Sequence, residues 1–230
     1  MRSPALAALI ADAAFISFEA QLQLAEQAGE HNWGVDLQEG IFRFEGERPS
    51  QHPVQLLGSA APGPRSWLWS WGNPGGYPDG VLRAAHSAQT LGEQYAIGEL
   101  TSAEVPFDAP DDDPGEEPGY ALGYDLSLAA RLASRTWFGY SGRVQGGTRV
   151  WMLLEGIELA APSAVRASRV LAEGLMSTRI DDHRRAVGSY AALRGLPWDG
   201  ATLSFPDGDL SVSFDELGRI SGISGTARPA

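Results

Sequence analysis

The feature that most restricts the fold is an alternating run of tryptophans at residues 65–73, which reads R-S-W-L-W-S-W-G-N. Successive side chains of a β-strand point to opposite faces of the sheet, so this run predicts a strand with Trp67, Trp69 and Trp71 on one face. The sequence N-P-G-G that begins at Asn73 predicts a turn at its end. A face that carries three indole rings must bury them in a core or use them to line a cavity.

Helical and strand periodicities follow one another along the rest of the chain. Helices are expected at residues 4–28, 79–96, 122–134, 163–176 and 181–193, and strands at residues 33–37, 41–45, 54–59, 136–144, 148–157, 201–205, 210–214 and 219–223. Glycine-containing turns join neighbouring strands into hairpins. The pattern predicts an α+β fold with antiparallel sheets, helices packed on one face and two related lobes.

An acidic, proline-rich segment is the one clear break in composition. Residues 101–119 hold four prolines and seven carboxylates, which is typical of a solvated loop or linker. The break predicts an N-terminal lobe at residues 1–101, a linker at residues 102–119 and a C-terminal lobe at residues 120–230. A chain of 230 residues also fits a single large domain.

The basic residues and the missing cysteines exclude several kinds of chemistry. The chain has no cysteine, and all 17 basic residues are arginine. A thiolate nucleophile, a cysteine zinc site, a phosphate-loop lysine and a pyridoxal Schiff base are therefore excluded. The net charge of −12 makes nucleic acid an unexpected partner, because binding to its backbone requires an excess of basic side chains.

The apolar N-terminus is interpreted as a helix of the folded protein. Asp12 interrupts the apolar residues 4–18, and the helical pattern continues beyond them without a signal-peptide cleavage site. No stretch holds the roughly 20 apolar residues that are needed to span a bilayer. We therefore expect a soluble, cytoplasmic protein without a membrane partner.

The positions of the histidines predict neither a metal site nor a cofactor. The four histidines are dispersed, and none has the H-x-x-x-H spacing of a metal site. Asp182 and His183 form the only close acid–histidine pair, but neighbours on a helix point about 100° apart and cannot easily act together. Catalysis by His183 with a carboxylate that the fold brings close is kept as an alternative.

The tryptophan run allows two interpretations. Its rings would lie roughly 7 Å apart on one strand face, a spacing that suits stacking against a sugar, a nucleobase or a cation. Large aromatic side chains more often fill a core, and this interpretation is favoured. Asn73 in the same way either orients a ligand or, as is favoured, caps the turn.

Three segments together resemble an uncharacterised bacterial domain family. They are the tryptophan run with Asn73, the Glu104-Val105-Pro106 loop that follows an alanine-rich helix, and the closing turn at residues 213–219. The family is recognised by a W-x-W-x-W-x-N-like strand, and the resemblance extends over most of the chain. It implies one recurring fold and no activity, and the acidic insert at residues 108–118 departs from the family pattern.

The function that these observations favour is that of a non-catalytic binding or interaction protein. No catalytic constellation can be assembled from the sequence, whereas its aromatic residues and acidic charge suit a protein or small-molecule partner. Two alternatives stay open. One is a hydrolase or transferase that uses His183 and a carboxylate, and the other is a sugar- or nucleotide-binding module that uses Trp67, Trp69 and Trp71.

Overall fold

The structure is a computed structural model that describes residues 2–107 and 117–227. Its contacts divide the chain into a terminal unit, Met1–Gln23 with Glu158–Ala230, and a central unit, Leu24–Ile157. The segment at residues 102–119 falls inside the central unit, and its residues 108–116 lie outside the described part. Both units combine helices with antiparallel strands, so the predicted α+β class is confirmed.

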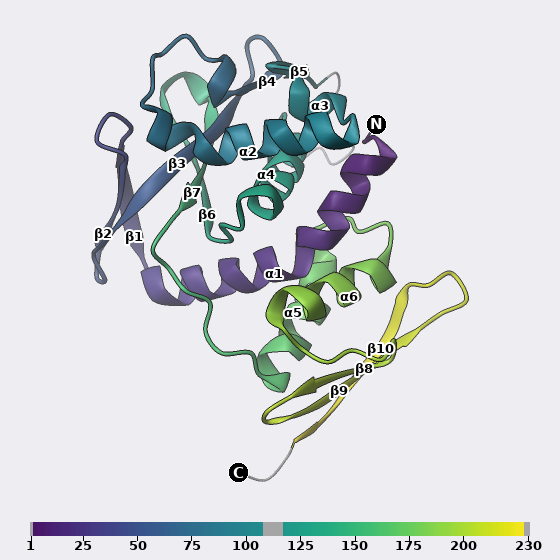
Figure 1. Ribbon diagram of the computed structural model, residues 1–230. Coiled ribbons are helices and arrows are strands. Elements are labelled where there is room, and N and C mark those ends of the chain that lie inside the picture. Colours follow the sequence, from purple (N-terminus) through teal and green to yellow (C-terminus); the bar gives the residue numbers. More distant parts are fainter. Residues whose placement is uncertain (1, 108–116, 228–230) are drawn as a thin grey trace. The chain divides into compact units, whose positions relative to one another are not determined.

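The central unit is built on a branched antiparallel sheet. Its strands are β1 (His31–Asp36), β2 (Ile41–Gly46), β3 (Ser50–Ala61), β4 (Ser66–Trp69), β5 (Glu104–Pro106), β6 (Gly139–Arg143) and β7 (Arg149–Leu154). The order is β1-β2-β3-β4-β5, while β7 pairs with both β3 and β6. The branch arises because β3 is long: β2 pairs with its first part, and β4 and β7 pair with its second part (Figure 1).

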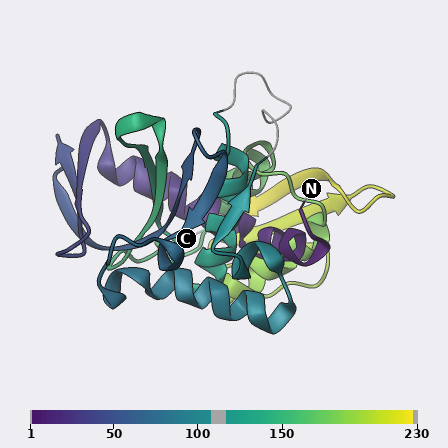
Figure 2. The ribbon, with the colours of Figure 1, turned by 90° about the horizontal axis from the view of Figure 1, so that it is seen from above.

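Three helices complete the central unit. They are α2 (Asp79–Tyr95), the short α3 (Gly98–Thr101) and α4 (Tyr120–Ser134). Helix α2 contacts β3 and α4, and α4 contacts β3 and β7, so both long helices lie against the sheet (Figure 2). The buried side chain of Gln55 on β3 holds α2 in place, because its Oε1 accepts a hydrogen bond from the backbone N–H of Ala84 at 2.6 Å.

The terminal unit combines helices with a small sheet. Most of the long helix α1 (Pro4–Ala28) belongs to it, together with α5 (Ala164–Ser177), α6 (His183–Arg194), β8 (Thr202–Phe205), β9 (Gly208–Phe214) and β10 (Ile220–Ala227). The strands form a meander in the order β10-β9-β8, and α5 contacts β9 and β10. Phe15 of α1 packs edge to face against Tyr190 of α6 at 6.4 Å and also contacts Gly174 of α5.

The expectation that no stretch is apolar enough to span a bilayer is wrong for helix α1, which is long and apolar enough to cross a membrane by length and composition alone. Within its most apolar window, 61% of the residues are buried inside the structure. Burial of this kind is expected for the core helix of a soluble protein, because a membrane span would expose its apolar surface to lipid. The predicted soluble character agrees with this burial.

The start of α6 offers a local test of stability. Asp182 is the N-cap, and its Oδ1 accepts a hydrogen bond from the backbone N–H of Arg185 at 2.9 Å. Asp182→Ala is expected to lower the free energy of unfolding by about 1 kcal/mol, because that N–H loses its partner. Asp181→Ala is the matched control, since Asp181 is half exposed and bridges only the exposed Arg179. Urea denaturation checks both variants, and equal losses would contradict the capping role.

Candidate binding site

The tryptophan strand is shorter than the alternation predicts, because it ends at Trp69. Strand β4 covers Ser66–Trp69, and the next three residues form a 3-10 turn that contains Trp71. Trp67 and Trp69 pack edge to face at 5.3 Å and are fully buried, with 0% exposure. Trp67 also packs against Trp151 of β7 at 5.3 Å. This burial favours the core interpretation, and ligand binding by these rings stays a prediction.

A glycine in β3 makes room for the indoles. Gly58 pairs with Trp69 of β4 on one side and with Trp151 of β7 on the other. A Cβ atom at Gly58 would lie 2.6 Å from the Trp67 ring and 2.5 Å from the carbonyl oxygen of Leu68. Such distances are far inside van der Waals contact, so a side chain at this position would push the rings apart. The indole rings of Trp67, Trp69 and Trp151 are thus closely packed on the sheet.

Asn73 and Trp71 lie in the turn that follows the strand. The Oδ1 of Asn73 accepts a hydrogen bond from the backbone N–H of Gly75 at 2.9 Å, which is the turn-capping role favoured from the sequence. Trp71 is half-buried. The predicted set of three tryptophans on one face is therefore wrong for Trp71, because the backbone leaves the extended conformation after Trp69. Ligand binding by Trp71 or Asn73 stays a prediction.

The four histidines of the described residues hydrogen-bond to backbone or uncharged side-chain groups. The Nδ1 of His183 accepts a hydrogen bond from the backbone N–H of Ile220 at 3.1 Å, while Asp182 caps α6. The other three histidines contact carbonyl, hydroxyl or amide groups. Within residues 2–107 and 117–227 no group of His, Asp and Glu side chains could hold a metal ion. The described part of the chain thus pairs His183 with a backbone amide and not with a carboxylate.

A more distinctive group of side chains lies at the turn end of the β6–β7 hairpin. Arg143 of β6 and Arg149 of β7 occupy directly opposite positions in the ladder. Like charges at opposite positions of an antiparallel pair repel and destabilise the hairpin. A single carboxylate oxygen relieves this repulsion: Oε2 of Glu117 accepts from Arg143 Nε at 3.0 Å and from Arg149 Nη2 at 2.8 Å and Nε at 3.1 Å.

Arg149 is held by more than its ion pair. Its guanidinium lies 5.2 Å from the centre of the Tyr120 ring and 6.0 Å from that of Trp151, within the range of cation–π attraction. Its Nη1 also donates to the hydroxyl of Ser141 at 3.2 Å. We call Arg143, Arg149, Glu117, Tyr120 and Ser141 the arginine cluster. Because the aromatic rings and the hydroxyl hold the Arg149 side chain in one conformation, little conformational entropy is lost when its guanidinium group binds an anion.

The beginning of α4 adds to the positive potential of the arginine cluster. Glu117 lies three residues before Tyr120, the first residue of α4. The N-cap is Gly119, in the left-handed conformation at φ +77, so no side chain caps the first backbone N–H groups. The first of these N–H groups, that of Tyr120, donates to the backbone carbonyl oxygen of Glu117 at 2.9 Å. The positive end of a helix dipole favours a nearby anion, and among the described residues the carboxylate of Glu117 lies just before this end of α4.

The pKa of Glu117 shows the effect of the two arginines on its carboxyl group. Partial burial opposes ionisation of its carboxyl group, but the hydrogen bonds and charges of Arg149 and Arg143 outweigh that burial and lower the pKa below its ordinary value. The carboxylate therefore stays charged at neutral pH. Among the described residues two guanidinium groups share this one carboxylate, so the five residues of the arginine cluster carry an excess of one positive charge, although the whole chain carries −12.

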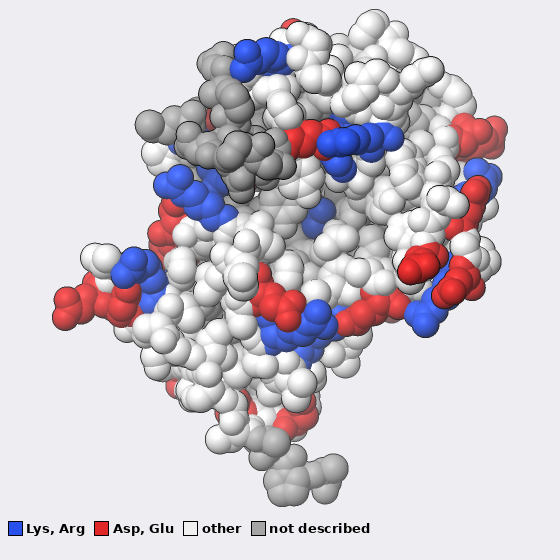
Figure 3. All heavy atoms as spheres, turned by 180° about the vertical axis from the view of Figure 1, so that it is seen from behind, with Lys and Arg blue, Asp and Glu red and all other residues white. Residues whose placement is uncertain are grey.

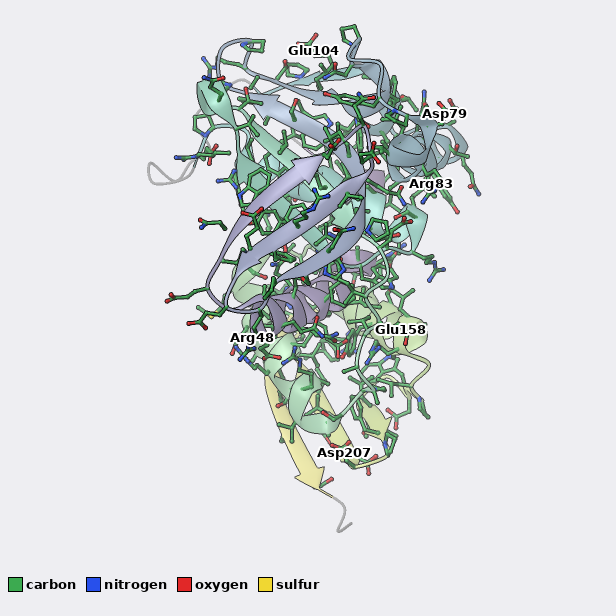
Figure 4. All side chains as sticks on the ribbon, turned by 90° about the vertical axis from the view of Figure 1, so that its left-hand side faces the viewer. Arg48, Asp79, Arg83, Glu104, Glu158 and Asp207 are labelled. Atoms are coloured by element: carbon green, nitrogen blue, oxygen red, sulfur yellow. The ribbon has the colours of Figure 1, made fainter. Side chains whose placement is uncertain are left out.

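Charges of the two signs are mixed elsewhere on the molecule. On the face drawn in Figure 3, most of the surface carries no charge, and the acidic and basic side chains form small groups with no large patch of one sign. Arg83 of α2, labelled in Figure 4, is an example of a simple pair, in which one arginine bridges one carboxylate: it lies 2.9 Å from Glu155. The described residues place no second arginine on Glu155, which also accepts a hydrogen bond from the side-chain amide of Gln55. The arginine cluster differs in that two guanidinium groups share one carboxylate oxygen. Its chemistry is that of an anion-binding site.

Sequence reasoning overlooked the arginine cluster, although one signal for it was present. Arg143 and Arg149 each lie one residue inside the facing ends of the two expected strands, so the sequence places both of them near one turn. Their register comes from the structure, where the turn is centred on Gly146, three residues from each arginine, and the two arginines lie opposite each other. Glu117 was included in the acidic segment that was predicted to be a solvated insertion, which is wrong for this residue because both arginines bind it. Only the tertiary fold brings the start of α4 to the hairpin.

Comparison with protein families settles the relationship of the chain. One family model matches residues 7–157, which is more than half of the 230 residues. The chain belongs to the family of unknown function DUF6882. No curated protein and no solved structure matches it. The prediction of membership in an uncharacterised family is thereby confirmed, whereas the bacterial origin and the tryptophan motif as its signature stay predictions.

The DUF6882 match contains the whole central unit and therefore the arginine cluster. It also contains the buried tryptophans. Helices α5 and α6 and the three-stranded sheet of the terminal unit lie after the matched region. The candidate binding site is therefore part of the DUF6882 region, and the surfaces of residues 158–230 belong to the remainder of the chain.

Proposed function

We propose that this DUF6882 member is a non-catalytic binding protein that recognises a carboxylate or phosphate group at the arginine cluster. The observation that carries the proposal is the convergence of Arg143 and Arg149, opposite each other in a hairpin, on one oxygen of Glu117. Planar guanidinium groups bind such anions through paired hydrogen bonds. The ligand is a small anionic molecule or an acidic side chain of a protein partner.

The site works by exchange of anions. In the structure Glu117 supplies the carboxylate that the arginines require, and it lies beside the acidic, proline-rich segment of the chain. An external anion competes with Glu117 for the same N–H groups, so the chain's own carboxylate sets the affinity. Arg143 is 65% exposed and can turn toward a ligand, while Arg149 stays fixed against Tyr120.

The net charge supports a small anion and not a polyanion as ligand. A nucleic acid or an anionic membrane would meet the −12 charge of the whole chain, whereas a single group meets only the local excess of the arginines. A cytoplasmic location is part of the proposal, supported by the absence of cysteine from the sequence. Binding through the tryptophans and catalysis by His183 receive less support from the burial and contacts described above.

Titration of the protein with small anions, observed at the arginine side chains, tests the proposal. Inorganic phosphate and succinate are added at constant ionic strength, with chloride as the reference, while NMR follows the Nε–Hε signals of Arg143 and Arg149. We expect saturable shifts with dissociation constants in the millimolar range, equivalent to about −4 kcal/mol. Glu117→Gln is expected to tighten binding by roughly fivefold to tenfold, because the variant lacks the competing charge.

The controls separate binding from a purely structural ion pair. Arg143→Gln is expected to abolish saturation, and because Arg143 is mostly exposed the fold should persist. Arg83→Gln, which removes an arginine of a simple pair in the same unit, is expected to leave the titration unchanged. If the wild-type signals respond to phosphate no more than to chloride, or if Glu117→Gln binds no tighter than the wild type, the proposal fails.

A further inference from the structure

Helix α5 of the terminal unit carries an unusual outer face. Its inner face is buried through Ala164, Ala167, Val170, Leu171 and Gly174. On the opposite side Val165 is 77% exposed and Met176 is 89% exposed, the highest values among the exposed large apolar residues of the described part. An ordinary amphipathic helix would place polar residues there. The outer face therefore has apolar surface that the described residues of the terminal unit leave uncovered.

The exposed residues of α5 have the spacing that is typical of a contact between two packed helices. Val165, Arg169, Ala172 and Met176 are all exposed, and they follow one another at intervals of four, three and four residues. This is the alternation by which one helix presents a continuous stripe to another. Three of the four residues are apolar, and the stripe spans about 16 Å, from 11 residues at 1.5 Å each. We call these four residues the α5 stripe.

We infer that the α5 stripe is the contact surface of a weak homodimer, in which the α5 helices of two copies pack antiparallel about a two-fold axis. The stripe is symmetric about its own midpoint. An axis between Val170 and Leu171 places Val165 of each copy opposite Met176 of the other, and Arg169 opposite Ala172. A two-fold interface requires this kind of self-complementary surface.

The charged residues of α5 favour an antiparallel pairing of two copies. Arg169 and Glu173 already form an ion pair along the helix at 2.8 Å. In the antiparallel pair, Arg169 of each copy comes close to Glu173 of the other, so attraction acts across the interface as well. A parallel pair would instead place the two Arg169 side chains opposite each other, and like charges at a seam position disfavour that arrangement.

The small size of the stripe makes the dimer weak. A contact of three helical turns falls at the low end of specific interfaces, below about 1,200 Å² in total. We therefore expect a dissociation constant of roughly 10–100 μM, equivalent to about −6 kcal/mol. This inference does not depend on the anion site, because α5 lies outside both the central unit and the DUF6882 match.

The absence of cysteine allows a direct test by disulfide cross-linking. Val165→Cys and Met176→Cys are prepared as two single variants of the full chain, which carry tags of different mass. Each is oxidised alone, and the two are oxidised as an equal mixture. A disulfide forms only where two Cα atoms approach within about 7 Å. We expect the mixture to give the mixed dimer about tenfold faster than either variant alone gives a dimer, because only the mixture places the two thiols together.

Leu217→Cys is the control for random collisions. Leu217 is 76% exposed in the turn between β9 and β10 and does not belong to the α5 stripe. A mixture of Val165→Cys with Leu217→Cys is expected to react at the slow background rate. If this mixture reacts as fast as the mixture of Val165→Cys with Met176→Cys, the inference is overturned. A faster reaction of Val165→Cys with itself would also overturn it, since that result indicates parallel helices.

Sedimentation velocity gives the second measurement, on the chain without cysteines. The mean mass is expected to rise with concentration across the range of about 5–200 μM. Arg169→Glu is expected to lower the association constant by about threefold to tenfold, because two carboxylates then meet at the interface. The exchange Arg169→Glu with Glu173→Arg is expected to restore it. A chain that stays monomeric over this range, or an exchanged variant as weak as the single one, overturns the inference.

Discussion

Replacement of Glu19 by alanine is expected to lower the free energy of unfolding by about 3–5 kcal/mol. Glu19 lies on α1 and is only 3% exposed. Its Oε2 is 3.1 Å from Arg194 Nε and accepts a hydrogen bond from the Tyr190 hydroxyl at 3.1 Å. Without Glu19, the nearly buried guanidinium of Arg194 keeps its charge and loses its counter-ion. Urea denaturation followed by far-UV circular dichroism measures the loss.

A triple variant shows whether that loss comes from the ion pair or from packing. Burial raises the pKa of Glu19 even though Arg194, the Tyr190 hydrogen bond and Arg166 act in the opposite direction, so keeping the charge inside is costly. Glu19→Leu with Tyr190→Phe and Arg194→Met removes the carboxylate together with the two groups that contact it and keeps Arg166. We expect this variant to lie within about 2 kcal/mol of the wild type. A loss below about 1 kcal/mol for Glu19→Ala would contradict the role assigned to the pair.

Local signals in the sequence predict the elements of this fold closely. Helix α1 has the bounds expected from its apolar pattern, residues 4–28. The helix expected from residue 163 begins as α5, where the Oγ of Ser163 accepts a hydrogen bond from the backbone N–H of Arg166 at 3.2 Å. The hairpin expected from residues 136–144 and 148–157 is also present. Propensity, capping and turn chemistry act within a few residues, so a single sequence carries enough information to place these features.

The pairing of the strands was harder to predict because it depends on distant residues. Strands β4 and β7 were assigned to different lobes, yet both pair with β3 within one sheet. The three-residue strand β5, Glu104–Pro106, was treated as part of a linker, although it pairs with β4. A strand of this length has too little periodicity to be recognised, and its partner decides its conformation.

The arginine cluster likewise combines a feature that local sequence signals indicate with one that depends on distant residues. The observed turn sets the opposite positions of Arg143 and Arg149, and only their nearness to a common hairpin turn was predictable in principle. The position of Glu117 was not, because it depends on how α4 lies against β7. Its neighbours in the sequence are acidic and proline-rich, a composition typical of solvated segments. Local composition was thus misleading for the one carboxylate of this segment that the arginines bind.

Replacement of Trp69 by alanine is expected to cost about 3–5 kcal/mol of unfolding free energy, as for other fully buried aromatic side chains. Trp69 has 0% exposure and packs against Trp67 in the middle of the central unit. An exposed ligand platform would behave differently, because truncation of its rings would change binding and leave stability within about 0.5 kcal/mol. Urea denaturation therefore separates the two interpretations of the tryptophan run.

A comparison of two phenylalanine variants isolates the polar edge of each indole. The N–H of Trp69 donates to the carbonyl oxygen of Glu99 at 3.0 Å, whereas the N–H of Trp67 is buried without a hydrogen-bond partner among the described residues. Trp69→Phe and Trp67→Phe remove similar volumes, but among the described residues only Trp69→Phe breaks a hydrogen bond of an indole N–H. We expect Trp69→Phe to be more destabilising by about 1–2 kcal/mol. Equal losses of unfolding free energy would mean that the Glu99 hydrogen bond contributes nothing to stability. A larger loss for Trp67→Phe would mean that the N–H of Trp67, and not that of Trp69, makes the more favourable interaction.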